Sequence, residues 1–275
     1  MIDAHQHYWH PARGDYDWMP MDNAILARPY HPVDLAPMLA DHGIEQTVLM
    51  QAAATVEETE YMLGIADATP SVAAVVGWVD FEDPGHRGQL ERLAQHPKFV
   101  GVRPMIQDIV DDNWMLRADI AWAFEAVTEL DLTFDALGFP RHLKNFHTIL
   151  TRYPDMRVVI DHCMKPQIRA HASETFAAWA EGMRALAKDT GAFCKFSGLV
   201  TEIDGWSVDK LAPYAAQVLD VFGPTRVMWG SDWPVCQLEA SYGEWRAAAE
   251  RLTAGLGADD RAAIFGGTAK AFYRI

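Results

Sequence analysis

The chain has 275 residues, half of them hydrophobic, and a formal net charge of −15 at pH 7. A chain of this length can bury a large core, and its acidic balance without any Lys/Arg cluster argues against nucleic acid and anionic membranes as partners. The longest apolar stretch, residues 72–79, is too short to span a bilayer. Three widely spaced cysteines and no recognisable signal peptide lead us to expect a soluble, cytoplasmic protein.

Strand-like and helix-like segments alternate along the whole chain. Eight short, mostly apolar runs are predicted strands: 2–9, 47–53, 72–80, 99–105, 132–137, 157–163, 192–199 and 226–233. Helices are expected between them at 32–42, 56–69, 84–96, 117–130, 140–153, 174–190 and 207–222. Two further helices, at 240–256 and 259–273, are expected after the last strand.

Eight such units in succession predict an α/β fold, a single-domain (β/α)8 TIM barrel spanning residues 1–275. A doubly wound open sheet is the alternative, but no G-x-G-x-x-G sequence follows any predicted strand. Closure of the barrel requires the last strand to pair with the first. In barrels of this type the site lies at the carboxyl ends of the strands.

The first strand carries Asp3, His5 and His7 on one face, because side chains alternate along a strand. Two imidazoles at positions i and i+2 can share one metal ion, or they can point together at one substrate oxygen. A His-x-His pair alone is equally typical of ordinary hydrogen-bonded histidines. Polar residues on the remaining strands decide between these two interpretations.

Polar residues recur near the carboxyl ends of the other predicted strands. They are Gln51, Asp80, Arg103, Asp135, Asp161, His162, Lys195, Ser197 and Asp232. A barrel built for stability alone would place aliphatic side chains at these positions. A structural polar network at the rim is the alternative, but convergence from so many strands favours a functional site at the mouth.

Five motifs together resemble the amidohydrolase superfamily, and within it the sugar-lactonase and pyrone-dicarboxylate-lactonase branch. They are DAHQH at 3–7, GVRP at 101–104, VIDHCMKP at 159–166, KFSGL at 195–199 and WGSDWP at 229–234. The resemblance covers nearly the whole chain and implies a TIM barrel with a hydrolytic site at its mouth. It also implies that the active-centre residues are His5, His7, His162 and Asp232, with Arg103 binding substrate.

The chain departs from the two-metal members of that superfamily. They carry a carboxylated Lys or a Glu at the end of strand four, where this chain has Arg103, and a His on strand five, near Asp135 here. We therefore expect at most one divalent ion, zinc by preference, bound by His5, His7 and Asp232. Members of the branch exist with and without a metal, so the ion could be dispensable for catalysis.

The predicted activity is that of a carboxylic-ester hydrolase. Its partner would be a small sugar lactone of the L-fucono-, L-rhamnono-, D-arabinono- or galactaro-lactone type, opened to the aldonic acid. Asp232 is the expected base that activates water, while His5, His7 and His162 polarise the carbonyl. The expected substrate-binding residues are Arg103, Trp114, Gln51, Asp80 and Asp135. A homo-oligomer is compatible with the sequence.

Two other functions stay open. A zinc-dependent decarboxylase or hydratase of the same superfamily would act on an aromatic or dicarboxylic acid and would need a carboxylate clamp. Arg103 is the only Arg at a strand end, with Arg28 and Arg169 available only from loops, which favours a neutral substrate. A non-catalytic barrel ranks last, because it would leave Asp232 and the histidines without a role.

Overall fold

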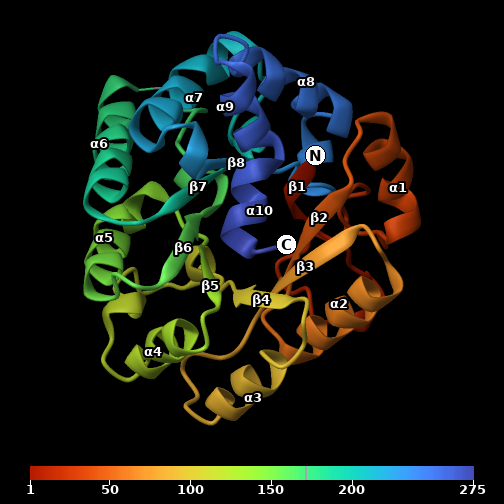
Figure 1. The fold of residues 1–275 in the computed structure, drawn as a ribbon, viewed down its shortest axis with the longest axis vertical. Coiled ribbons are helices and arrows are strands. Elements are labelled where there is room, and N and C mark those ends of the chain that lie inside the picture. The colour runs from red at the N-terminus through yellow and green to blue at the C-terminus, as the bar shows by residue number, and fades with distance from the viewer. Residues whose placement is uncertain (171) are drawn as a thin grey trace.

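Eight parallel strands, each paired with the next in chain order, form one sheet in a computed structural model that describes residues 1–170 and 172–275 (Figure 1). The strands are β1 (Ile2–Gln6), β2 (Gln46–Met50), β3 (Val72–Gly77), β4 (Phe99–Val102), β5 (Thr133–Ala136), β6 (Arg157–Ile160), β7 (Phe193–Phe196) and β8 (Val227–Trp229). The predicted TIM barrel is confirmed.

The first and last strands meet at the mouth of the barrel. Gln6 and Trp233 form a parallel bridge, and the His7 N–H donates to the Trp233 carbonyl at 2.7 Å. The Asp232 N–H donates to the His5 carbonyl at 2.8 Å. The predicted pairing of the two ends of the sequence is therefore confirmed.

A ring of helices surrounds the strands (Figure 1). They are α1 (Pro32–Asp41), α2 (Val56–Ala68), α3 (His86–Leu93), α4 (Ala121–Glu129), α5 (Leu143–Arg152), α6 (Ser173–Asp189), α7 (Val208–Phe222) and α8 (Tyr242–Leu252). Side-chain oxygens cap several of them; the Glu58 N–H, for example, donates to Thr55 Oγ1 at the start of α2. None of the described helices is both long and apolar enough to cross a membrane.

The prediction of one continuous helix over residues 259–273 is wrong. The structure divides it into α9 (Ala258–Ala262), a π-helical turn η9 (Ala263–Gly267) and α10 (Thr268–Tyr273). Two successive glycines, Gly266 and Gly267, weaken the helix at this point. The break turns α10 across the end of the barrel, where it lies inside the ring of strands in Figure 1.

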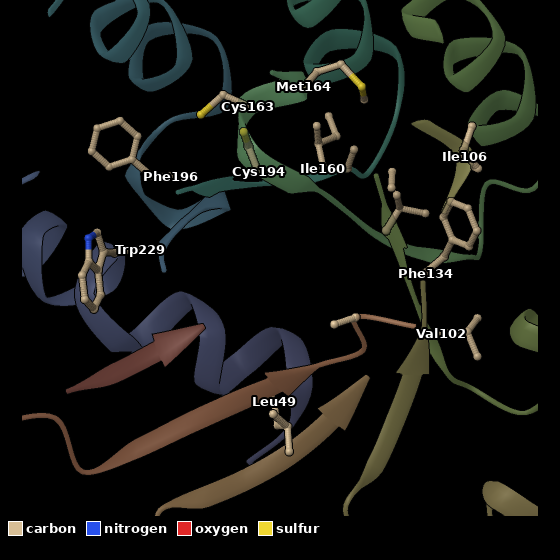
Figure 2. Close-up of a cluster of buried hydrophobic side chains, with 14 of the residues drawn as sticks. Leu49, Val102, Ile106, Phe134, Ile160, Cys163, Met164, Cys194, Phe196 and Trp229 are labelled. Carbon is tan, nitrogen blue, oxygen red and sulfur yellow. The ribbon is translucent and has the colours of Figure 1, made fainter. Parts of the chain in front are cut away.

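The inner and outer faces of the strands differ in chemistry. Outward-facing apolar side chains pack under the helices and are fully buried; they include Leu49, Val102, Phe134, Ile160 and Phe196 (Figure 2). Inward-facing residues near the amino ends of the strands are also apolar, and Phe272 and Tyr273 of α10 pack against them. Polar residues fill the interior toward the carboxyl ends. Alternation along the strands, together with a register shift in β1 between Asp3 and Gln6, directs them to one mouth.

Candidate active site

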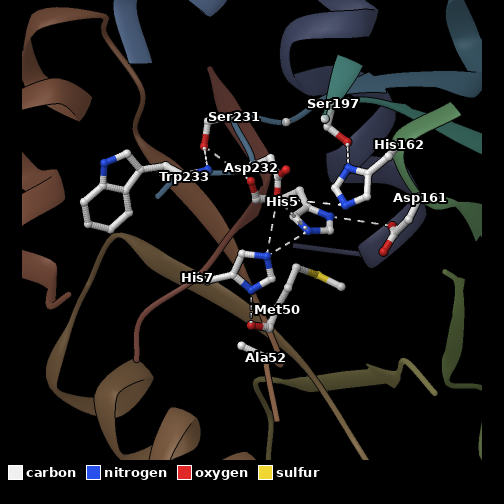
Figure 3. Close-up of polar contacts among 12 residues, drawn as sticks. His5, His7, Met50, Ala52, Asp161, His162, Ser197, Ser231, Asp232 and Trp233 are labelled. Carbon is white, nitrogen blue, oxygen red and sulfur yellow. Dashed lines mark hydrogen bonds and ion pairs between the residues drawn. The ribbon is translucent and has the colours of Figure 1, made fainter. Parts of the chain in front are cut away.

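Three potential ligand atoms meet where β1 and the segment after β8 come together (Figure 3). The Nε2 atoms of His5 and His7 lie 3.2 Å apart. Asp232 Oδ1 lies 3.6 Å from His5 Nε2 and 3.5 Å from His7 Nε2. All three residues are buried at the base of the mouth. The predicted convergence of the sequence termini on one site is thus present in atomic detail.

His162 enters the same cluster from the end of β6. Its Nε2 lies 3.9 Å from Asp232 Oδ1, and its Nδ1 is within hydrogen-bonding distance of Ser197 Oγ, at 2.9 Å. Its ring centroid is 4.5 Å from that of His5. The four predicted active-centre residues, His5, His7, His162 and Asp232, therefore form one group.

A left-handed backbone turn places His162. Four successive residues, His162 to Lys165, have φ between 45° and 59°, and Asp232 has φ 57°. This conformation costs about 1–2 kcal/mol for each L-residue and persists only where the surrounding structure holds it. Gly198 belongs to that surrounding structure, because a Cβ at its position would lie 2.5 Å from His162 Nδ1.

The hydrogen bonds and burial fix the charge state of the cluster. His7 Nδ1 lies 2.9 Å from the Met50 carbonyl, which can only accept, so Nδ1 carries the proton and Nε2 presents a lone pair. Burial lowers the pKa of His7 and brings that of His162 to about 4, so both imidazoles are neutral at pH 7. Burial and the nearby Lys195 ammonium hold the pKa of His5 well below its usual range.

Asp232 is ionised in the same surroundings. Its burial alone would raise the pKa of the carboxyl, but His162, His7 and His5 together hold it below the ordinary value. Neutral imidazoles beside a carboxylate are the protonation states that a divalent cation requires of its ligands. The same carboxylate is also in the state required of a base.

The donor set fits one divalent ion. With zinc-to-ligand distances near 2.0–2.1 Å, two ligand atoms of a tetrahedral site lie roughly 3.3 Å apart. The separations among His5 Nε2, His7 Nε2 and Asp232 Oδ1 are 3.2, 3.5 and 3.6 Å. On the other side of His5, Lys195 Nζ lies 3.2 Å from Nδ1, so an ammonium group already holds that position. A single ion is therefore the better fit.

Arg103 is anchored beside the cluster. Its Nη1 lies 3.1 Å from Asp161 Oδ2, and its Nε and Nη2 donate to Gln51 Oε1 at 3.0 and 2.8 Å. Asp161, rather than Asp80 or Asp135, is the carboxylate that faces Arg103 across the interior. Arg103 is thus held in one orientation, with its guanidinium 3.3 Å from His5 Nε2.

Lys195 continues the charged network into the interior. Its Nζ lies 3.0 Å from Asp161 Oδ1 and 2.5 Å from Asp135 Oδ2, so the buried ammonium is paired with two carboxylates. Tyr273 of α10 donates its hydroxyl hydrogen to Asp135 Oδ2 at 2.7 Å. Asp135 is therefore a partner of Lys195 and Tyr273, below the mouth.

A cavity of about 230 Å³ opens over the cluster. Its polar lining residues are His7, Arg103, Gln107, His162, Lys165, Thr201 and Asp232, and its other lining residues include Trp9, Trp18, Leu26, Ala52, Met105, Leu137, Val235 and Leu238. His5 and Gln51 lie directly behind this lining, in contact with His7 and Arg103.

The structure does not bring Trp114 or Asp80 to this cavity. Both line a neighbouring one, where Trp114 stacks on Phe81 and donates its indole N–H to Glu82 Oε1 at 3.0 Å. With Asp135 below the mouth, the substrate-binding role expected for these three residues has no support from their positions. Trp9 and Trp18 are the tryptophans at the cavity instead.

Three polar lining residues were missed by the sequence interpretation. Lys165 Nζ donates to Gln107 Oε1 at 2.6 Å, and Thr201 lines the cavity nearby. Lys165 lies in the 159–166 motif and could have been selected from it. Gln107 and Thr201 lie in short 3₁₀ turns after β4 and β7, where no local pattern marks them.

The match to a known family agrees with this geometry. The family described as "Amidohydrolase" matches residues 2–275. The chain belongs to the amidohydrolase family. Two curated relatives are both named "L-fucono-1,5-lactonase". The one from Burkholderia ambifaria is 44% identical, covering 100% of this chain and 95% of the relative. The one from Burkholderia multivorans is 36% identical, covering 100% and 96%.

Solved amidohydrolase structures superpose closely on the chain. An amidohydrolase from Burkholderia multivorans is 35% identical with a TM-score of 0.93, covering 100% of this chain and 99% of that one, in one crystal form with bound HEPES and in another with bound zinc. A probable 2-pyrone-4,6-dicarboxylic acid hydrolase from Acinetobacter baumannii, 18% identical, has a TM-score of 0.82 and covers 100% of this chain and 99% of that one. At that identity the second likeness shows the fold alone.

Proposed function

We propose that this amidohydrolase opens sugar-acid lactones to aldonic acids, with L-fucono-1,5-lactone as the first substrate to consider. The sequence identity of 44%, over the whole of this chain, to a protein named L-fucono-1,5-lactonase is the observation that carries the proposal. The grouping of Asp232 with three neutral imidazoles under one cavity supports it, because lactone hydrolysis needs a base and a polarised carbonyl.

The cavity suits a small polyhydroxylated ring. Trp18, which is 37% exposed and packs against the buried Trp9, offers an indole surface for the C–H face of a sugar, and Gln107 and Thr201 offer hydrogen-bonding groups for hydroxyls. Its volume of about 230 Å³ accommodates one monosaccharide lactone rather than an oligosaccharide. These residues would set substrate affinity and orientation.

In the proposed mechanism Asp232 acts first as a base. Its carboxylate takes a proton from a water molecule as that water attacks the lactone carbonyl, and a tetrahedral intermediate forms. Lys165, which lines the cavity, would donate a hydrogen bond to the oxygen that becomes negative, while Arg103 would hold the bound lactone. Asp232 then returns the proton to the ring oxygen as its bond to the carbonyl carbon breaks, which releases the aldonic acid.

A divalent ion held by His5, His7 and Asp232 would supply Lewis-acid polarisation of the carbonyl and a more acidic water. The bound zinc belongs to the Burkholderia multivorans structure. For this chain the donor distances and the His7 tautomer support a site of the same kind. His162 Nε2, 3.9 Å from the same Asp232 oxygen, would complete the surroundings of that carboxylate.

A lactone panel tests the proposal. Acid release from L-fucono-, L-rhamnono-, D-arabinono- and galactaro-lactones, in 1,5 and 1,4 ring forms, would be followed with a pH indicator and corrected for uncatalysed hydrolysis. We expect the highest kcat/KM with L-fucono-1,5-lactone and almost none for the Asp232→Asn variant. Equal rates for the two proteins on every lactone would contradict the proposal. Carbon dioxide release from an aromatic acid would indicate the decarboxylase alternative.

A further inference from the structure

A second cavity, of about 560 Å³, lies at the amino ends of the strands, away from the active-site mouth. The start of β1 and the start of β2 form one wall, and α8, α9, η9 and α10 form the others. In Figure 1 the N-terminus lies beside these elements. The charged side chains of its lining are Glu45, Arg246, Glu250, Arg261 and Lys270, and Met1 lies beside them.

Arg246, on α8, is a buried cation whose hydrogen-bonding capacity is largely unused. Its side chain is 5% exposed and is stacked on Phe265, with the guanidinium carbon 3.9 Å from the ring centroid. Its Nε and Nη1 have no hydrogen-bond partner among the described residues. Nη2 has an ion pair with Glu250 at 3.1 Å and a contact of 3.2 Å with the Met1 sulfur. A thioether is a weak acceptor for a guanidinium.

A second arginine adds positive charge at the same place. Arg261 of α9 lines the cavity, and its Nε is also buried without a partner among the described residues. Burial first, and the proximity of Arg261 in addition, lower the pKa of Arg246. Lys270 of α10 lies in the same lining. Buried arginines are normally paired, so Arg246, with the half-buried Arg261 and the exposed Lys270 in the same lining, has hydrogen-bond donors available for an anion.

We propose that this cavity binds an oxyanion, the phosphate group of a small metabolite, between Arg246 and Arg261. The phosphate takes the position of the Met1 sulfur at Arg246 Nη2, and its other oxygens reach Arg261 and Lys270. Met1 is 41% exposed, so its side chain can move aside. Phosphate is preferred to carboxylate because Arg246, Arg261 and Lys270 outnumber the carboxylates of Glu45 and Glu250 in the lining, and a tetrahedral dianion has oxygens for all three cations.

The site connects to the start of β1. Met1 and Ile2 line the cavity, and β1 continues from there to His5. A bound anion would therefore hold the beginning of the strand whose far end carries the active-centre histidines. Because the anion would bind only the folded state, it would raise the free energy of unfolding.

Calorimetric titration of the intact protein with inorganic phosphate, against chloride at equal ionic strength, tests the assignment. We expect saturable binding of one phosphate per chain. Arg261→Gln should weaken it by about tenfold or more, the usual effect of losing a hydrogen bond to a charged group. Arg251→Gln is the matched control, because Arg251 is exposed on α8 and lies outside the cavity lining. Its affinity for phosphate should be unchanged.

Two further arms complete the test. Glu250→Gln removes the carboxylate that competes for Arg246 and should tighten phosphate binding, opposite in sign to Arg261→Gln. A sugar phosphate and an aldonate distinguish the sources of the anion: tighter binding of the aldonate would overturn phosphate as the ligand class. Absence of binding, or equal affinity in the Arg261→Gln and Arg251→Gln proteins, would overturn the site itself. These readouts do not depend on lactone hydrolysis.

Discussion

The backbone N–H of Asp232 donates to the carbonyl of His5 at 2.8 Å, and the side chains of the same two residues approach to 3.6 Å. The bond that ties the last strand to the first thus joins the two residues that the proposed chemistry depends on. Gly230 permits this approach, since a Cβ at its position would lie 2.7 Å from His5 Cβ. Closing the barrel and assembling the site are therefore one structural event.

Replacement of Asp232 by Asn should lower kcat by about 10²–10⁴, the usual contribution of general acid–base catalysis. Asn suits the test because Asp232 has φ 57°, a left-handed conformation that Asn tolerates better than most residues. KM and the thermal midpoint should change little. Near-normal turnover on the best lactone would exclude Asp232 as the base and direct attention to His162.

Replacement of Arg103 by Met should raise KM for the lactone by about tenfold or more, because a charged hydrogen-bond donor leaves the cavity. It should also destabilise the fold by about 3 kcal/mol, since Asp161 loses a buried partner at 3.1 Å. Arg103→Lys is the control: it keeps a charge near Asp161 but lacks the two-pronged contact with Gln51. Kinetics and denaturant unfolding, measured on both variants, separate the two effects. An unchanged KM in Arg103→Met would contradict substrate binding by Arg103.

The barrel could be predicted because apolar runs and helical patterns alternate eight times, which few other folds allow. The predicted strands were too long at their carboxyl ends, as with 99–105 against Phe99–Val102. Arg103, just beyond the end of β4, still donates its backbone N–H to the Gly77 carbonyl at 2.9 Å, while its side chain bonds to Asp161 across the interior. A pattern of hydrophobicity cannot distinguish a strand from the extended chain that follows it.

The site could be predicted only in part. His5, His7 and Asp232 came from their places at strand ends, and the structure places them together. The position of Trp114 could not be inferred, because the path of the loop after β4 depends on long-range packing against Phe81. The left-handed turn at His162 leaves no local signature either, since no glycine occurs from 162 to 165.

One divalent ion per chain is the expected metal content. Zinc added to metal-free protein should raise the thermal midpoint, because the ion binds the folded donor set, and elemental analysis should give one equivalent. His7→Ala removes the lone pair fixed by Met50 and should abolish both effects. His147→Ala, at a partly exposed position on α5, is the control and should abolish neither. Two equivalents per chain would contradict a mononuclear site.

The buried carboxyl group of Glu58 should make the free energy of unfolding depend on pH. Its carboxyl group is buried behind the cavity wall, where it accepts backbone N–H bonds from Ala52 and Ala53, at 2.7 Å for the shorter. Burial raises the pKa of this carboxyl from 4.5 to about 8 in spite of those bonds. Between these two values the folded state holds a proton that the unfolded state has lost.

The contribution of Glu58 to the free energy of unfolding should therefore be largest below pH 4.5 and should fall as the pH rises toward 8. One proton corresponds to a slope of about 1.4 kcal/mol per pH unit within that window. Glu58→Gln removes the titrating group. The free energy of unfolding of the wild type minus that of the variant, measured by urea unfolding from pH 5 to 9, should therefore decrease as the pH rises and can change sign. Glu57→Gln, an exposed neighbour on α2, should run parallel to the wild type. A Glu58→Gln curve parallel to the wild type as well would show that the carboxyl is already ionised in the folded protein, with its backbone hydrogen bonds outweighing its burial.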